Sequence, residues 1–472
     1  MKKLAILVIL ALVVAVPAYA QLGDVDNSSF VIQNLGTNEA SVTVTFYDAA
    51  GAAVTPNPIL PGPGGCADPA ALPNPFSLGA NGAKQEVYMP SVCGLADGRY
   101  SVVIEATEPL GVIANLIGDQ GGGATFYNGS YSGFPAGDMN VYFPSTQYEF
   151  YGWNSLISIQ NVSGSPINAT LHVYGEDGAE LDSFLYSNIP AFSSVHVDFE
   201  VDALGLTAGL NGSAMIECTG ACVAVDNQTA DGGFTQSYNG FLAGGQTLFA
   251  PALYTSYYTW GASLKVQNIG GVATDIAVTY MIEGGGTCAV PAATIQPNQS
   301  LYHYLPTDWA VWGCANATDK IIGAKVTSTA TDVVAVSNAA NPANQAQTYG
   351  GLIQTDGAAE VGLPVVMNQY YGWDTAFVCQ NVSDAGTATV TYSYAGIGCP
   401  ADPVYAGCSF TLAPGEAKSV YQPGDLDASV GLFAASINAT GANIACIANE
   451  TLGAGQSNGT GDWSMSYNGF GQ

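Results

Sequence analysis

Positive charge is scarce in this sequence, and charge of either sign is sparse. Eight Lys and Arg stand against 37 Asp and Glu among 472 residues, and charged residues make up 10% of the chain. Ordinary soluble domains contain about 25%. Nucleic acids and anionic lipids bind clustered Lys and Arg, which displace counterions from phosphate groups. Because the basic residues here are scattered, neither is an expected partner.

Motifs that carry catalysis are also missing. The three histidines, His172, His196 and His303, lie in alternating segments that are typical of strands. The sequence contains no G-x-S-x-G nucleophile elbow, H-E-x-x-H zinc motif or phosphate-binding loop. A Ser–His–Asp triad or a pair of carboxylates assembled from distant positions stays open. We therefore expect a non-catalytic protein, with a hydrolase as the less favoured alternative.

One short segment suggests a cofactor. Residues 23–27 (GDVDN) resemble the start of a Ca²⁺ loop, since hard cations prefer oxygen ligands. The later Glu and the spacing of a full loop are missing, so a solvated acidic segment is the favoured interpretation. Apart from this weak Ca²⁺ candidate, no cofactor is expected.

A long apolar run occurs only at the start of the sequence. Lys2 and Lys3 precede the run Leu4–Val16, and small residues around Ala20 offer a cleavage site. The run is shorter than the roughly 20 residues that a membrane helix needs, so an export signal is favoured over an anchor. We expect residues 1–20 to be a signal peptide. The mature chain should be secreted or displayed on the cell surface, with no membrane span.

Two sequence markers recur along the chain. The first is a strand-like segment that ends in Gln-Asn, at residues 30–34, 157–161, 264–268 and 377–381. The second is the segment Tyr-Asn-Gly-Phe or a variant of it, at residues 131–134, 238–241, 349–352 and 467–470. Two independent markers with similar spacing predict internal repeats. The predicted repeats are 21–134, 135–242, 243–353 and 354–472.

Within each repeat, apolar and polar residues alternate, as in the segment 41–46 (SVTVTF). Alternation gives a strand one buried face and one wet face. About seven short strands in roughly 110 residues match a β-sandwich of two antiparallel sheets. A repeat of this size can bury its own core, so we expect an all-β chain of independent modules, like beads on a string. A β-propeller is the competing architecture, although its blades need only about 40–50 residues.

The sequence resembles the tandem immunoglobulin-like repeats of prokaryotic secreted and cell-surface proteins. The resemblance rests on the Gln-Asn strands, the Val-Thr alternation at residues 42–45, the turn at Pro414-Gly415 and the closing Tyr-Asn-Gly-Phe. It covers nearly all of residues 21–472 and implies four immunoglobulin-like antiparallel β-sandwich repeats. Such modules serve as spacers, lattice units and adhesins, so the resemblance implies an architecture rather than one function.

Ten cysteines in an exported chain predict a disulfide framework. They sort by repeat into five pairs, namely Cys66–Cys93, Cys218–Cys222, Cys288–Cys314, Cys379–Cys446 and Cys399–Cys408. The first and third pairs have nearly equal spacing, which indicates one bridge inherited by two repeats. Cys218 and Cys222 flank what we interpret as a tight turn, where a bridge would staple a hairpin. None of the spacings suits a zinc site.

Two further residue patterns concern sugars. Asn-x-Ser/Thr sequons are frequent and mark either glycosylation sites or the Asn-rich turns of a β-protein. Those outside the Gln-Asn marker are Asn27, Asn128, Asn168, Asn211, Asn227, Asn298, Asn316, Asn438, Asn449 and Asn458. A Tyr-x-Trp motif also recurs, with Trp153, Trp260 and Trp373 before the Gln-Asn strand. These aromatics could stack on sugar rings, but a plug at the end of each core is the favoured interpretation.

The start of the first repeat differs from the others. Repeats two to four begin with an apolar segment that ends in Pro, at residues 141–144, 248–251 and 361–364, and the first repeat has no such segment. A sandwich without its first strand exposes unpaired backbone groups. A strand from another chain could cover them. The alternative is that the Pro-rich loop at residues 56–75 folds back over the gap.

These observations favour a secreted, non-catalytic structural protein of the cell surface or extracellular matrix, such as a coat, lattice or filament subunit. Sparse charge points this way, because few like charges oppose contact between copies. The alternative is an adhesin or carbohydrate-binding module. The expected partner is accordingly another copy of the chain or a surface polysaccharide.

Overall fold

The computed structural model describes residues 6–12, 25–59, 71–89, 92–120, 125–202, 205–230, 233–343, 345–400, 403–426, 430–452, 460–461 and 464–471. The fold is all-β, as the sequence predicts, with several antiparallel sheets. The α-helices in these ranges are the short α1 (Leu305–Val311) and α2 (Gln422–Asp425). Across the same ranges, no helix has the length and apolar character needed to cross a membrane.

The strands fall into four groups in chain order, which we call groups 1 to 4. Group 1 contains two sheets. The first sheet consists of β1 (Ile6–Leu12), β7 (Tyr100–Ala106), β3 (Ala40–Tyr47), β4 (Ala53–Val54) and β5 (Phe76–Leu78). The second consists of β9 (Thr125–Ser132), β8 (Leu110–Gln120), β2 (Val25–Asn34) and β6 (Lys84–Tyr88), with β34 (Thr460–Gly461) added in parallel to β9.

Group 2 is one continuous sheet because a single strand runs through both of its halves. Its strands are β10 (Asp138–Tyr148), β11 (Trp153–Asn161), β12 (Ile167–Tyr174), β13 (Glu180–Ile189), β14 (Ser194–Asp198), β15 (Leu210–Ala230) and β16 (Phe234–Asn239). The Cys218–Cys222 bridge lies inside β15, where the strand passes from pairing with β12 to pairing with β11. The bridge is therefore present, but the predicted hairpin turn is wrong.

Groups 3 and 4 each contain two sheets. In group 3 they are β20 (Thr287–Ala289), β19 (Thr274–Ile282), β23 (Ile322–Ser328), β17 (Thr247–Leu253), β26 (Leu352–Ile353) and β21 (Ala293–Ile295), facing β22 (Ser300–Tyr304), β18 (Gly261–Asn268), β24 (Val333–Asn341) and β25 (Gln345–Gly350). In group 4 they are β30 (Ser409–Leu412), β29 (Ala388–Tyr394), β32 (Gly431–Thr440), β27 (Glu360–Asn368) and β36 (Phe470–Gly471), facing β31 (Ala417–Tyr421), β28 (Trp373–Asn381), β33 (Ile444–Leu452) and β35 (Ser464–Asn468).

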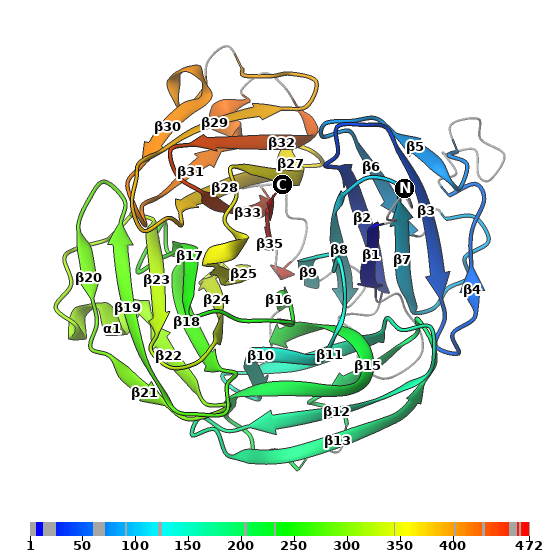
Figure 1. The fold of residues 1–472 in the computed structure, drawn as a ribbon, viewed down its shortest axis with the longest axis horizontal. Helices are drawn as coiled ribbons and strands as arrows, with labels where there is room; N and C mark the ends of the chain where they lie inside the picture. The colour runs from blue at the N-terminus through cyan, green and yellow to red at the C-terminus, as the bar shows by residue number, and fades with distance from the viewer. Residues whose placement is uncertain are drawn as a thin grey trace.

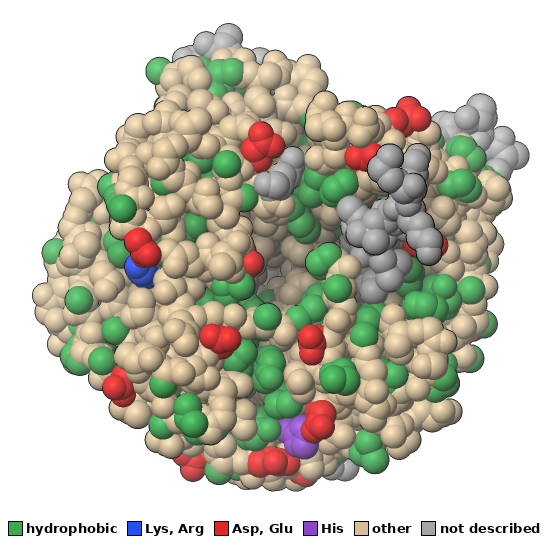
Figure 2. All heavy atoms as spheres, in the orientation of Figure 1, with side chains coloured by type: hydrophobic (Ala, Val, Ile, Leu, Met, Phe, Trp, Pro, Cys, Tyr) green, Lys and Arg blue, Asp and Glu red, His purple; other side chains and the backbone are tan. Residues whose placement is uncertain are grey.

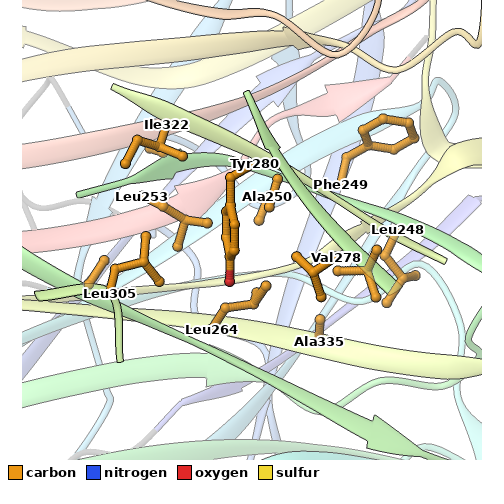
Figure 3. Close-up of a cluster of buried hydrophobic side chains, with 14 of the residues drawn as sticks. Leu248, Phe249, Ala250, Leu253, Leu264, Val278, Tyr280, Leu305, Ile322 and Ala335 are labelled. Atoms are coloured by element: carbon orange, nitrogen blue, oxygen red, sulfur yellow. The ribbon is translucent and has the colours of Figure 1, made fainter. Parts of the chain in front are cut away.

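Each group has an apolar core between its two layers of strands. In group 3, β19 alternates buried and more exposed residues, as a strand with one core face should. Its Tyr280 packs among Leu253, Leu264 and Leu305, which come from β17, β18 and α1 (Figure 3). The core clusters also contain residues of the neighbouring group, such as Val378 and Ile447 of group 4 in the cluster of group 3. The groups therefore share apolar contacts and do not stand apart.

The Asn of each Gln-Asn marker is fully buried and fixes the end of its strand. In Asn161, Oδ1 accepts from the backbone N–H of Ser163 at 2.8 Å, and Nδ2 donates to the carbonyl of Ile189 at 3.0 Å. Asn381 uses the same two kinds of bond, to Ser383 and Leu412. Each bond pairs a backbone group that the strand end would otherwise leave unsatisfied.

The four groups are arranged in a ring (Figure 1). The strands that carry the Tyr-Asn-Gly-Phe marker, β9, β16, β25 and β35, meet at its centre, each against the next. Side chains bridge them: Asn239 Nδ2 donates to the carbonyl of Ser132 at 2.6 Å, and Gln347 Nε2 donates to Ser464 Oγ at 2.6 Å. The expectation of beads on a string is therefore wrong. The alternation predicts that these polar residues face water, but at the axis of the ring they form hydrogen bonds with one another.

The first strand of each group also packs against the following group. Strand β10 lies against β18 and β24, β17 against β28 and β33, and β27 against β2 and β8. In group 1 this place is taken by β1, which pairs with β7 and lies against β11 and β15. The ring thus has four interfaces, in each of which the first strand of one group packs against the next group. We name each interface by the two groups that it joins.

Candidate functional site

Three of the four interfaces present aromatic side chains, and the Tyr-x-Trp motif supplies one wall of each. The backbones of Phe150 and Trp153 exchange two hydrogen bonds, which makes a tight hairpin with Tyr151 and Gly152 at its tip. Both tip residues have positive φ, 50° and 82°, the conformation of a type I′ turn. The turn projects Tyr151 into solvent with 89% of the residue exposed.

The other two motifs repeat this geometry. Tyr258 and Tyr371 stand at the tips of equivalent turns, 73% and 85% exposed. The three tryptophans, Trp153, Trp260 and Trp373, are half-buried at the base of each turn. Trp260 and Trp373 pack against the cores of their own groups. The predicted core plug therefore accounts for the buried part of Trp260 and Trp373. The adjacent tyrosines are exposed and can contact a ligand.

The opposite wall of each interface comes from the following group. Tyr304, Tyr421 and Tyr88 occupy the same register on β22, β31 and β6, where each pairs with the residue four positions before the Gln of the marker strand. They are 41%, 49% and 42% exposed. Interfaces 2–3, 3–4 and 4–1 therefore have aromatic side chains on both walls. In interface 1–2 this position on β14 is Asp198, and group 1 has no Tyr-x-Trp motif.

Two of these interfaces form clefts of ligand size. The cleft at interface 2–3 has a volume of about 480 Å³ and is lined by Phe150, Tyr151, Trp153, Tyr302 and Tyr304, with Gln147, Gln236 and Asn338 among its polar groups. The cleft at interface 3–4 has a volume of about 510 Å³ and is lined by Tyr254, Tyr257, Tyr258, Trp260 and Tyr421, with Gln347, Ser419 and Asn449. Small-molecule sites occupy about 300–1,000 Å³.

The side chains that line both clefts are uncharged. None of the residues that line them is Asp, Glu, Lys, Arg or His. Burial raises the pKa of the Tyr302 hydroxyl to about 12, so it stays protonated at physiological pH. At interface 4–1, the hydroxyl of Tyr370 lies 3.3 Å from Glu86 Oε2, and burial raises its pKa to about 12. The clefts offer flat aromatic faces with amide and hydroxyl groups, and no carboxylate pair of the kind that glycoside hydrolysis uses.

The histidines do not assemble a catalytic triad among the described residues. His196 Nδ1 lies 2.8 Å from Ser158 Oγ, a pair that the sequence does not reveal. Burial, with a smaller contribution from the charge of Arg99, lowers the pKa of His196 to about 3. His303 bonds to the hydroxyl of Tyr280, and His172 to Glu180. A serine nucleophile needs a histidine oriented by an acid, whereas the charge acting on His196 is that of Arg99.

The predicted disulfides are found wherever both cysteines are described. Besides Cys218–Cys222, the structure contains Cys288–Cys314, Cys379–Cys446 and Cys399–Cys408. Cys93 is also disulfide-bonded, and Cys66 lies outside the described residues. Four bridges indicate an extracellular or otherwise oxidising environment.

The glycosylation candidates divide by exposure. Four of them, Asn128, Asn211, Asn227 and Asn449, are at most 7% exposed. A buried amide has no room for a sugar, so the prediction is wrong for these four in the folded chain. Asn168 and Asn316 are exposed, whereas Asn27, Asn298 and Asn438 are half-buried. For these five glycosylation stays a prediction, and Asn458 lies outside the described residues.

The Ca²⁺ candidate gains no support. Residues 25–27 are the start of β2, and residues 23 and 24 lie outside the described part of the chain. Within that part, no three His, Cys, Asp or Glu side chains gather as metal ligands.

Comparison with known proteins adds little to this geometry. No family model and no curated protein sequence matches the chain. The crystal structure of Thermotoga maritima 1070 aligns with 23% of this chain and 95% of its own, at 19% identity and a TM-score of 0.20. Trypsin-activated alpha-2-macroglobulin from Escherichia coli aligns with 95% of this chain and 40% of its own, at 10% identity and a TM-score of 0.11. Scores this low carry no functional information.

Proposed function

We propose that this chain is a secreted, non-catalytic carbohydrate-binding protein of the cell surface or extracellular space, built from four tandem immunoglobulin-like repeats. The observation that carries the proposal is the aromatic design of interfaces 2–3, 3–4 and 4–1. A pyranose ring has an apolar face that packs on Tyr or Trp, and hydroxyls around its rim that bond to Gln, Asn and Ser. The two measured clefts present both kinds of group and no charge.

A repeated site suits a repeated ligand. The two clefts, together with the aromatic walls of interface 4–1, can each hold a segment of the same polysaccharide, and multivalent binding raises overall affinity without new contacts. The alternative, a coat, lattice or filament subunit, is favoured by a different observation. Lys and Arg are nearly absent from the face in Figure 2, and Asp and Glu are scattered over it. Few charges oppose contact between copies of such a surface.

The test of carbohydrate binding uses the exposed tyrosines, because their replacement leaves the cores intact. Wild-type protein should bind members of a glycan array, and the Tyr258→Ala variant should lose binding at interface 3–4. The combined variant Tyr151→Ala, Tyr258→Ala and Tyr371→Ala should lose roughly tenfold or more in affinity, the equivalent of about 1.4 kcal/mol.

Two controls make this result specific. The Tyr→Phe changes at the same three positions should retain the affinity, because the stacking face remains. Leu185→Ala removes an exposed apolar side chain of β13, an edge strand that lines neither cleft, and should have no effect. Binding that is undiminished in the triple Ala variant would contradict the proposal. Absence of glycan binding, with ordered assemblies in electron micrographs, would favour the lattice subunit.

A further inference from the structure

The clefts at interfaces 2–3 and 3–4, here called cleft 2–3 and cleft 3–4, have matching aromatic walls but different floors. By the floor of a cleft we mean its buried lining residues. The floor of cleft 2–3 consists of Gln147, Gln236, Ser263 and Ala339. The floor of cleft 3–4 consists of Tyr254, Ile321, Gln347, Val378 and Asn449. The first floor is therefore mostly polar, whereas the second contains three large apolar or aromatic side chains.

One pair of equivalent positions carries most of this difference. Gln147 and Tyr254 each lie four residues before the exposed tyrosine of their turn. In cleft 3–4, the Tyr254 hydroxyl accepts a hydrogen bond from Asn449 Nδ2 at 3.1 Å, and this bond joins the two groups across the floor. The equivalent of Asn449 in cleft 2–3 is Asn338, which donates instead to Ser145 Oγ at 3.4 Å. No such bond to Gln147 closes the floor of cleft 2–3, whose lining residues are all described.

The amide oxygen of Gln147 has no partner in the structure. Gln147 is 7% exposed, and its Oε1 is a buried acceptor without a hydrogen bond. Among the residues that line the two clefts, all of them described, it is the one that holds such an atom. Buried polar groups are normally paired, and leaving one unpaired costs free energy. The last torsion of a Gln side chain is broad, so the amide can turn its oxygen toward a group that enters the cleft.

The backbone holds Gln147 firmly at this position. Its N–H donates to Ser155 Oγ at 3.0 Å, and Ser155 Oγ in turn donates to the buried Asp226 at 3.0 Å. Gln147 also pairs with Asn211 near the end of β10. The acceptor is therefore carried by a fixed strand. A site whose buried polar group bonds to a ligand hydroxyl discriminates strongly against ligands that lack that hydroxyl.

We propose that cleft 2–3 is the site that selects the sugar, and that it takes a neutral pyranose unit with one ring hydroxyl directed at the floor. The ring lies between the walls that carry Tyr151 and Tyr304, and the hydroxyl donates a hydrogen bond to Gln147 Oε1. Cleft 3–4, whose floor is closed by the bond between Tyr254 and Asn449, contributes stacking without this selection. The inference rests on the carbohydrate-binding function proposed above.

The test isolates cleft 2–3 in the full chain. The background variant Tyr258→Ala, Tyr371→Ala removes the exposed tyrosines of the other two interfaces. Calorimetry then measures binding of three neutral probes, the β-1,4-linked hexasaccharides of glucose, mannose and N-acetylglucosamine. For each probe that binds, addition of Gln147→Met should weaken binding roughly tenfold, because Met keeps the shape of the side chain and removes the acceptor.

The same substitution in a second background serves as the control. In Tyr151→Ala, Tyr371→Ala, which leaves cleft 3–4, Gln147→Met should not change the affinity. Urea unfolding should show no loss of stability in Gln147→Met, because the amide oxygen has no bond to lose.

The outcomes separate this inference from the function on which it rests. If the probes bind and Gln147→Met leaves the affinity of cleft 2–3 unchanged, the inference is overturned and the carbohydrate-binding function stands. An equal loss in both backgrounds would also overturn it, because Gln147 would then act through the whole fold. If wild-type protein binds none of the three probes, the carbohydrate-binding function and this inference are both contradicted.

Discussion

Replacement of Glu450 by Gln should make the folded chain more stable. Glu450 lies on β33, is fully buried, and neither of its carboxylate oxygens has a hydrogen-bond partner in the structure. Burial raises the pKa of this carboxyl from its usual 4.5 to about 8. The folded state therefore binds a proton that the unfolded chain releases above pH 4.5, and this contribution to stability falls as pH rises from 4.5 to 8.

The magnitude follows from the two pKa values. Keeping Glu450 protonated costs about 3 kcal/mol at pH 7 and about 1 kcal/mol at pH 5, at 1.36 kcal/mol per pKa unit. Gln carries no such cost and has nearly the same shape. Group 2 shows that it fits, because Gln228 occupies the equivalent register and donates to the carbonyl of Ser145 at 2.7 Å. The Val365 carbonyl occupies the equivalent place in group 4.

Urea unfolding of wild-type protein and Glu450→Gln at pH 5 and pH 7 checks the prediction. The variant should be more stable by about 3 kcal/mol at pH 7, and the gain should shrink toward about 1 kcal/mol at pH 5. The reverse change in group 2, Gln228→Glu, should destabilise, because Gln228 Nε2 lies 2.9 Å from the buried Asp226. A Glu450→Gln protein that is no more stable than wild type at pH 7 would refute the reasoning, as would a gain that does not depend on pH.

Two other substitutions have outcomes of defined sign. Tyr238→Phe should lower the free energy of unfolding, measured in urea, by about 1–3 kcal/mol, because it leaves both backbone groups of Ser145 unpaired. Burial lowers the pKa of Lys265 from 10.5 to about 7, so its contribution to stability rises from pH 7 to 10.5. The unfolding free energy of wild type should rise by about 2 kcal/mol relative to Lys265→Met between pH 7 and pH 9, and a constant difference would contradict this.

The local structure follows from the sequence because it depends on short-range rules. Alternation along residues 41–46 predicts a strand with one core face, and β3 alternates in that way. The cysteine spacings predict Cys288–Cys314 and Cys399–Cys408, since bridges within one repeat close short segments. The Tyr-x-Trp recurrence marks the segments that form the aromatic clefts, although it gives no sign that the opposite wall comes from a different group.

The ring does not follow from the same rules. Gln236, Gln347 and Ser464 look like wet-face residues of half-buried strands, yet all three are buried at the axis. A polar residue can be buried without penalty when its neighbour is another polar strand, as with Gln347 and Ser464. Alternation identifies a second face but does not say whether water or protein covers it. The closing marker is therefore wrongly interpreted as the end of an independent module, because its strands pack against one another at the axis.

Interface 1–2 differs from the other three interfaces in both of its walls. Group 1 has no Tyr-x-Trp motif, and Asp198 stands where the opposite wall of the other interfaces has a tyrosine. The two changes agree, because a sugar ring held between two walls needs an aromatic face on each of them. The aromatic walls are therefore confined to interfaces 2–3, 3–4 and 4–1, where Tyr304, Tyr421 and Tyr88 face the exposed tyrosines of the preceding groups.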